Sequence, residues 1–125
     1  MPDAKMNDIA TPEDIDVLID TFYGQLIQHP EMRPFFDHID LDHHLPRIKH
    51  FWRFVLLNDP GYTTNVFDKH VHMPLQKKHF DIWVQLFCTA VDGLFAGDLA
   101  NDAKLRARTL GFTFAYKMEQ LNTPQ

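Results

Sequence analysis

The sequence predicts a single all-α domain, and two observations carry this prediction. Apolar residues recur at helical spacing in almost every segment, and no segment alternates apolar and polar residues as a half-buried strand does. A length of 125 residues fits one domain with a substantial core. Because there is no internal repeat, low-complexity tract or linker, we interpret residues 1–125 as one domain, with residues 1–11 as a flexible N-terminal tail.

The first helix is predicted to begin at Thr11, because a hydroxyl cap followed by Pro12 is a typical helix start. Its apolar face continues for three turns. Pro30 marks its end, since the residue before a proline disfavours helical conformation. A short helix is then expected to carry three large apolar residues, Met32, Phe35 and Phe36.

A second long helix is predicted to start from a carboxylate cap at Asp40 or Asp42 and to run to about Leu57. Residues 58–61, Asn-Asp-Pro-Gly, indicate a turn, because each of these residue types favours turn geometry.

The rest of the chain contains one irregular segment and two more helices. Residues 62–74 are less regular, and a short helical piece around residues 66–72 is our interpretation. A long helix follows and ends just before Gly97, which suits the position past a helix end. Asp98 or Asn101 is expected to open the last helix.

Charge and cysteine content exclude several classes of protein. The net charge of −5, from 12 basic and 17 acidic residues, argues against nucleic acid as a partner, because phosphate binding needs a basic stripe. Cys88 is the only cysteine, so no internal disulfide can form. The chain has no signal-peptide pattern and no apolar stretch long enough for a membrane span. We therefore expect a cytoplasmic protein.

Common catalytic and metal-binding motifs are missing. His-Glu-x-x-His is absent, and none of the three glutamates is followed three residues later by a histidine, as a di-iron bundle requires. There is no Gly-x-Gly-x-x-Gly loop, and Cys88 lies in an apolar run where a thiol is a poor nucleophile. The sequence therefore offers no motif for nucleophilic or phosphoryl-transfer chemistry.

Two histidines, His44 and His70, favour an iron cofactor instead. They lie 26 residues apart on separate helical segments, each among apolar and aromatic residues. A haem needs one strong axial ligand, usually histidine, and walls of large apolar side chains. Tyr23 on the buried face of the first helix and Trp83 on the long helix that follows residues 62–74 add a hydroxyl and an indole N–H. The alternative is a haem-free helical protein whose histidines are structural or bind a simple metal.

Four strings, in this order and at compatible spacing, resemble the truncated haemoglobins, and most of all the bacterial group III: residues 22–23, 44–52, 69–74 and 80–87. The match covers about residues 15–120. The absence of any Gly-Gly pair also fits group III. The resemblance implies a globin-like fold, a truncated two-over-two helical sandwich, that holds haem b.

The resemblance also implies roles for individual residues around the iron. His70 matches the proximal iron ligand. Tyr23, His44 and Trp83 match the three polar residues on the opposite, distal side, which hold the bound ligand.

Three further positions are implied as haem contacts. Phe36 matches the phenylalanine that wedges the ring, and Ile48 packs over the distal face one turn after His44. Arg47, which faces outward, is expected to pair with a haem propionate. One departure concerns residues 40–43, where the family often has a tryptophan and this chain has none.

Neighbouring histidines compete for two of these roles. His72 and His79 are alternatives to His70 as the iron ligand; His72 would face roughly the other way on a helix, and His79 could bond its own backbone. His43 is an alternative to His44. We favour His44 because it stands four residues before Ile48, on the buried stripe.

The function expected from this resemblance is binding of O2 or related diatomic ligands. A distal tyrosine with a tryptophan would hold the ligand firmly and slow its release. Slow release suits peroxide or nitric oxide chemistry better than bulk oxygen transport. Redox chemistry would need an electron-donating reductase as a partner, and whether the protein is an enzyme stays open at this point.

Overall fold

The computed structural model describes residues 6–37, 39–61 and 75–122, with only the backbone of residues 121 and 122. Within these ranges the chain is helical and contains no strand, which confirms the all-α prediction. The elements are α1 (Pro12–Leu26), η1 (Arg33–Phe36, a 3-10 helix), α2 (Leu41–Leu57), α3 (Lys77–Leu94) and α4 (Asp98–Asn122). The short helical piece expected around residues 66–72 lies outside the described residues.

Side-chain caps start α1 and α2 where the sequence predicts. Thr11 Oγ1 accepts the backbone N–H of Asp14 at 3.2 Å, and the Asp14 carboxylate accepts the N–H of Thr11 at 3.1 Å. At α2 the carboxylate of Asp40 accepts the N–H of Asp42 at 3.0 Å. Asp40, rather than Asp42, is therefore the cap of this helix.

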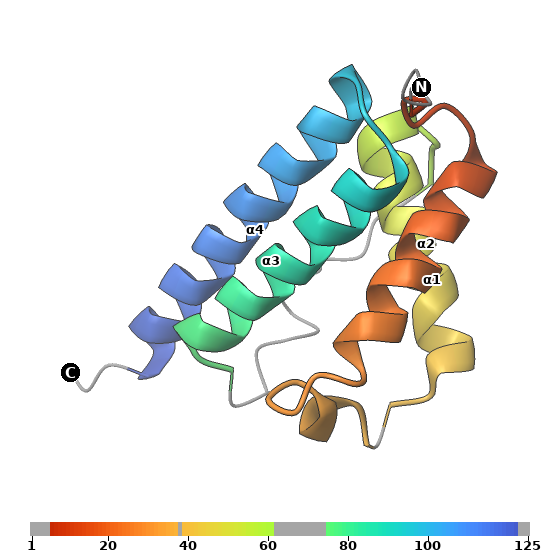
Figure 1. The fold of residues 1–125 in the computed structure, drawn as a ribbon. Helices are drawn as coiled ribbons and strands as arrows, with labels where there is room; N and C mark the ends of the chain where they lie inside the picture. The colour runs from red at the N-terminus through yellow and green to blue at the C-terminus, as the bar shows by residue number, and fades with distance from the viewer. Residues whose placement is uncertain (1–5, 38, 62–74, 123–125) are drawn as a thin grey trace, which may run out of the picture.

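The helices form two pairs. α1 packs against α2, and α3 packs against α4, while contacts of α1 with α3 join the pairs (Figure 1). This arrangement is the two-over-two helical sandwich that the resemblance implies. Within the described residues, no helix is both long and apolar enough to cross a membrane.

A stack of aromatic rings joins the two pairs at the centre of the core. Phe87 of α3, which is fully buried, stacks on Trp52 of α2 with 4.5 Å between ring centroids. Its other neighbours are Trp83, with parallel rings at 5.8 Å, and Phe22 of α1, edge-on at 5.3 Å. Burying one such ring stabilises the fold by about 1.5–3 kcal/mol, so this stack fixes how α2 and α3 lie across each other.

α4 begins at Asp98, one of the two residues predicted to open it. A distant segment caps its first turn: the carboxylate of Asp8 accepts the backbone N–H groups of Leu99 at 2.9 Å and Ala100 at 2.8 Å. Burial by itself raises the pKa of Asp8, but these backbone donors outweigh it and lower the pKa.

The same contact changes the expectation of a flexible tail over residues 1–11. Ile9 is 1% exposed and belongs to the main core, so residues 8 and 9 are packed against the helices. Gly97 makes this approach possible, because a Cβ there would lie 2.5 Å from Cγ of Asp8, and its φ of +141° disfavours other residues.

Candidate functional site

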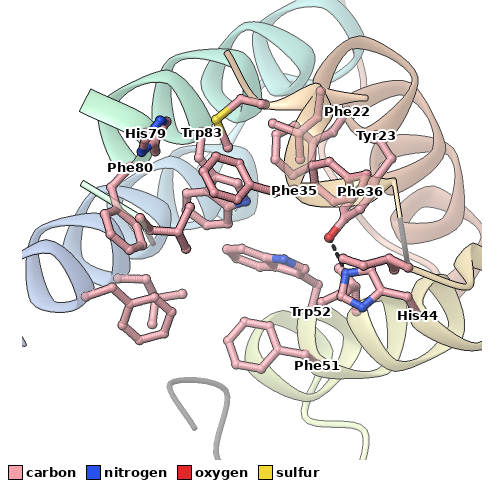
Figure 2. Close-up of a pocket in the computed structure, with 17 residues that line it drawn as sticks. Phe22, Tyr23, Phe35, Phe36, His44, Phe51, Trp52, His79, Phe80 and Trp83 are labelled. Carbon is pink, nitrogen blue, oxygen red and sulfur yellow. Dashed lines mark hydrogen bonds between the residues drawn. The ribbon is translucent and has the colours of Figure 1, made fainter. Parts of the chain in front are cut away.

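A deep pocket lies between the two helix pairs. Its cavity volume, measured as the space open to a water-sized sphere, is about 80 Å³. Its walls are almost entirely apolar, and aromatic rings make up most of them (Figure 2). The lining residues come from all four α-helices, η1 and the adjoining segments: Phe22, Tyr23, Leu26, Met32, Phe35, Phe36, Ile39, His44, Ile48, Phe51, Trp52, Leu75, His79, Phe80, Trp83, Leu110 and Phe114.

Tyr23 of α1 and His44 of α2 form the polar side of this pocket. The Tyr23 hydroxyl oxygen lies 2.7 Å from Nε2 of His44, and the bond joins two helices of one pair (Figure 2). Tyr23 is 6% exposed, and burial raises the pKa of its hydroxyl, so the group keeps its proton at any physiological pH.

The bond between these two side chains has two forms. In one, the hydroxyl of Tyr23 donates to Nε2 of His44. In the other, an Nε2–H of His44 donates to the hydroxyl oxygen, and the hydroxyl proton is then available to a third group in the pocket. A buried polar group needs a partner, and His44 lets Tyr23 keep one whether or not a ligand is present.

The structure places the adjacent histidines 43 and 44 on different sides of α2. The side chain of His43 is 82% exposed and lies 3.6 Å from the Asp40 carboxylate. His44 lines the pocket, four residues before Ile48, which also lines it. His44, the residue that the helical stripe favours, is thus the one of the two that lies inside the pocket.

Other predicted residues surround the polar side. Trp83 lines the pocket and meets Phe22 edge-on, with 5.7 Å between ring centroids. Phe36 of η1 lies edge-on to Tyr23 at 5.8 Å. The structure thus brings Tyr23, His44, Ile48, Trp83 and Phe36 together around one space. Arg47 is exposed and does not line the pocket.

A second histidine, His79, lies at the other side of the pocket, next to Phe80 (Figure 2). Its Nδ1 accepts the backbone N–H of Gln76 at 2.9 Å, and this bond closes the first turn of α3. The ring of Phe35 lies edge-on to it at 4.8 Å. Burial lowers the pKa of His79, and so does the charge of Lys78, while Glu31 opposes them. The neutral ring is thereby favoured.

The predicted iron ligand His70 and its competitor His72 lie outside the described residues. Among the residues that are described, no three His, Cys, Asp or Glu side chains gather as they would around a metal ion. The described residues therefore contain no group of side chains that could bind a metal ion by themselves.

Several pocket residues were not singled out as site residues from the sequence. Phe51 and Trp52 of α2 line the pocket. Leu110 and Phe114 of α4 line it too. Their i, i+4 spacing on the buried stripe of α4 was visible in the sequence, but spacing alone does not separate a cavity wall from a core.

The chain has relatives among known proteins, although no family model matches it. It is 24% identical over 109 residues to the group 3 truncated haemoglobin of Campylobacter jejuni, a match that covers 82% of this chain and 86% of that one.

Solved structures share the fold. A crystal structure of the group III truncated haemoglobin from Campylobacter jejuni superposes with a TM-score of 0.84 at 22% identity, covering 97% of this chain and all of the other. The truncated oxygen-avid haemoglobin from Bacillus subtilis gives 0.71 at 22% identity, covering 83% and 92% of the two chains. The chain therefore has the fold of the truncated haemoglobins and is similar in sequence to one of group 3.

Proposed function

We propose that the chain is a truncated haemoglobin of group III, which binds haem b in the pocket between its helix pairs and, at the haem iron, O2 or another diatomic ligand. The observation that carries the proposal is the character of the pocket. It is a mostly apolar space with aromatic walls, and on one side it holds the hydrogen-bonded pair Tyr23 and His44.

The residues present fit a haem. A porphyrin is a large, flat, apolar ring, and pockets for such ligands combine hydrophobic and aromatic walls with few polar groups. Here the aromatic side chains Phe36, Phe51 and Trp83 line the space. Filling the pocket with a flat ring would extend the aromatic contacts that already surround it.

Two kinds of residue would hold the haem. His70 is our proposed iron ligand, and Phe36 and Ile48 would contact the ring. His79 is a weaker candidate for the iron, because its Nδ1 is already bonded to the backbone of Gln76. Arg47 is exposed on α2, where a guanidinium can meet a carboxylate at the solvent edge, and we propose that it pairs with a propionate.

When bound, haem supplies an iron that takes up a diatomic ligand. The chain's own residues would then act on that ligand. Tyr23 keeps its proton and can donate it, provided that His44 supplies an Nε2–H in return. The indole N–H of Trp83 is a second donor. In a pocket from which water is largely excluded these bonds gain strength.

Two donors would slow the release of a polar ligand. We propose that slow release suits peroxide or nitric oxide chemistry better than oxygen transport. Such chemistry consumes electrons, so an electron-donating reductase is the proposed partner.

The test is a haemin titration of the purified chain. We expect one haem per chain and an intense Soret band. Replacing Phe36, which lines the pocket, by Ser should weaken haem affinity, because it removes an apolar wall and leaves a hydroxyl. The matched control is Phe112→Ser, at a ring that is 75% exposed, and it should leave the affinity unchanged. If the native chain binds no haem, the globin function is ruled out and a haem-free role for the histidines takes its place.

A further inference from the structure

His79 presents to the pocket a ring nitrogen that the bonds of the fold leave unused. Its Nδ1 accepts the backbone N–H of Gln76 at 2.9 Å, and a neutral imidazole carries one proton, so this bond places that proton on Nε2. The residue is 8% exposed and lines the pocket. Within the part of the chain that the structure describes, Nε2 has no hydrogen-bond partner. His79 therefore offers the pocket an N–H donor held in one orientation.

Two other roles for this nitrogen are excluded by its surroundings. A protonated ring nitrogen has no lone pair for a metal, so Nε2 cannot bind iron while Nδ1 accepts the Gln76 N–H. His79 is also separate from the pair Tyr23 and His44, because it stands at the start of α3 on another side of the pocket (Figure 2). The donor therefore needs an acceptor that is neither the iron nor its diatomic ligand.

We propose that His79 donates its Nε2–H to a propionate of the bound haem, an inference that rests on the haem binding proposed above. A buried donor needs an acceptor. The ring nitrogens of a haem are taken up by the iron, so the acceptors that the cofactor itself offers are the oxygens of its two propionates. One of these carboxylates is the proposed partner of Arg47, and the other is free for His79. A bond from an N–H to a carboxylate is charge-assisted and therefore strong.

The surroundings of His79 suit the carboxylate end of a haem. The pocket meets the surface here, because the neighbouring Lys78 is 58% exposed and pairs with Glu31 at 3.3 Å. The charge of Lys78 lowers the pKa of His79, and Glu31 opposes it with the smaller effect. A net positive field that disfavours the charged imidazole also attracts a carboxylate. On the pocket side, Phe35 lies edge-on to His79 at 4.8 Å, and Phe80 is the next wall residue. An apolar ring edge with a carboxylate tail fits this combination.

Esterification of the propionates tests the proposed bond. Zinc protoporphyrin IX, which has the side chains of haem, is titrated into the native chain and into His79→Glu, and binding is followed by porphyrin absorption. Glutamate keeps an acceptor for the Gln76 N–H at this position of the capping box but has no N–H to donate. His79→Glu should weaken binding of the free acid by about tenfold or more. The dimethyl ester should bind both proteins within about threefold of each other.

The matched control is His79→Gln. A glutamine amide oxygen can accept the Gln76 N–H while its NH2 group donates to the propionate. His79→Gln should therefore bind zinc protoporphyrin IX within about threefold of the native chain. Circular dichroism checks that both variants keep the fold.

The titration of His79 by NMR gives a second readout, which a merely structural role would not change. A carboxylate beside the ring favours its charged form, so the pKa of His79 should be higher in the complex with the free acid than in the complex with the dimethyl ester. An equal pKa in both complexes, or a His79→Glu variant that weakens both porphyrins to the same extent, would overturn the proposed bond alone. If the native chain binds neither porphyrin, the proposed haem function fails together with it.

Discussion

The pocket has a histidine on each of two sides, and the two differ in what they bond. His44 of α2 meets a side chain, the Tyr23 hydroxyl, on a different helix and 21 residues away in the sequence. His79 of α3 accepts a backbone N–H from Gln76, three residues before it in the same helix start. The Tyr23–His44 bond joins two side chains of the pocket, whereas the Gln76–His79 bond stabilises the start of α3.

This difference indicates which side of the pocket can respond to a ligand. A hydroxyl and an imidazole can exchange donor and acceptor roles, so the Tyr23–His44 pair can release a proton to a third group without losing its bond. A backbone N–H has no such freedom. Removing its acceptor takes away a side-chain cap at the start of α3, at a cost of about 0.5–2 kcal/mol.

The largest expected effect distinguishes His70 from His79 as the ligand of the haem iron. His70→Ala should abolish the Soret band of the reconstituted protein or grossly alter it, because the proposed axial ligand is lost. His79→Gln should leave the band intact, since glutamine is a usual acceptor at this position of a capping box. A Soret spectrum that changes with His79→Gln and survives His70→Ala would reverse the assignment and make His79 the ligand.

A smaller effect concerns the contribution of His79 to the stability of the folded chain, which depends on pH. The folded state lowers the pKa of His79 from its ordinary value near 6.5. Below that value the unfolded chain binds more protons than the folded one, so the contribution of His79 is fully present above about pH 6.5. It is lost as the pH falls through the lower, folded pKa.

Urea unfolding of the chain between pH 8 and pH 5 measures this contribution. The native chain should lose more stability on acidification than His79→Gln, which keeps an acceptor for the Gln76 N–H but does not titrate. The comparison isolates His79 because the other histidines are common to both proteins. Parallel curves for the two proteins would mean that His79 is not coupled to folding.

Much of this site could be predicted from the sequence. Helical spacing predicted the all-α fold and placed His44, rather than His43, on the inner stripe. The family resemblance supplied Tyr23, Trp83 and Phe36, and the structure brings these residues to one pocket. Local patterns sufficed for Tyr23, His44 and Trp83 because each of them lies on a long amphipathic helix, whereas Phe36 lies on the short helix η1.

Local sequence patterns could not predict contacts between segments that lie far apart in the sequence. The cap of α4 comes from Asp8, more than 90 residues before Leu99 and Ala100, so no local motif marks it. The pocket role of Leu110 and Phe114 likewise depends on how α4 crosses the other helices. His79 was recognised as able to bond its own backbone, and the structure confirms it.

The central claim is that the Tyr23–His44 side of the pocket holds the bound ligand. The most direct measurement is the O2 dissociation rate of the reduced, haem-loaded protein by stopped-flow. Tyr23→Phe should raise this rate by about tenfold or more, because it removes a hydrogen bond to the ligand. His44→Leu should raise it less, and His79→Gln should leave it within about twofold of native. A dissociation rate that is unchanged in Tyr23→Phe would contradict the account, since the hydroxyl would then have no part in holding the ligand.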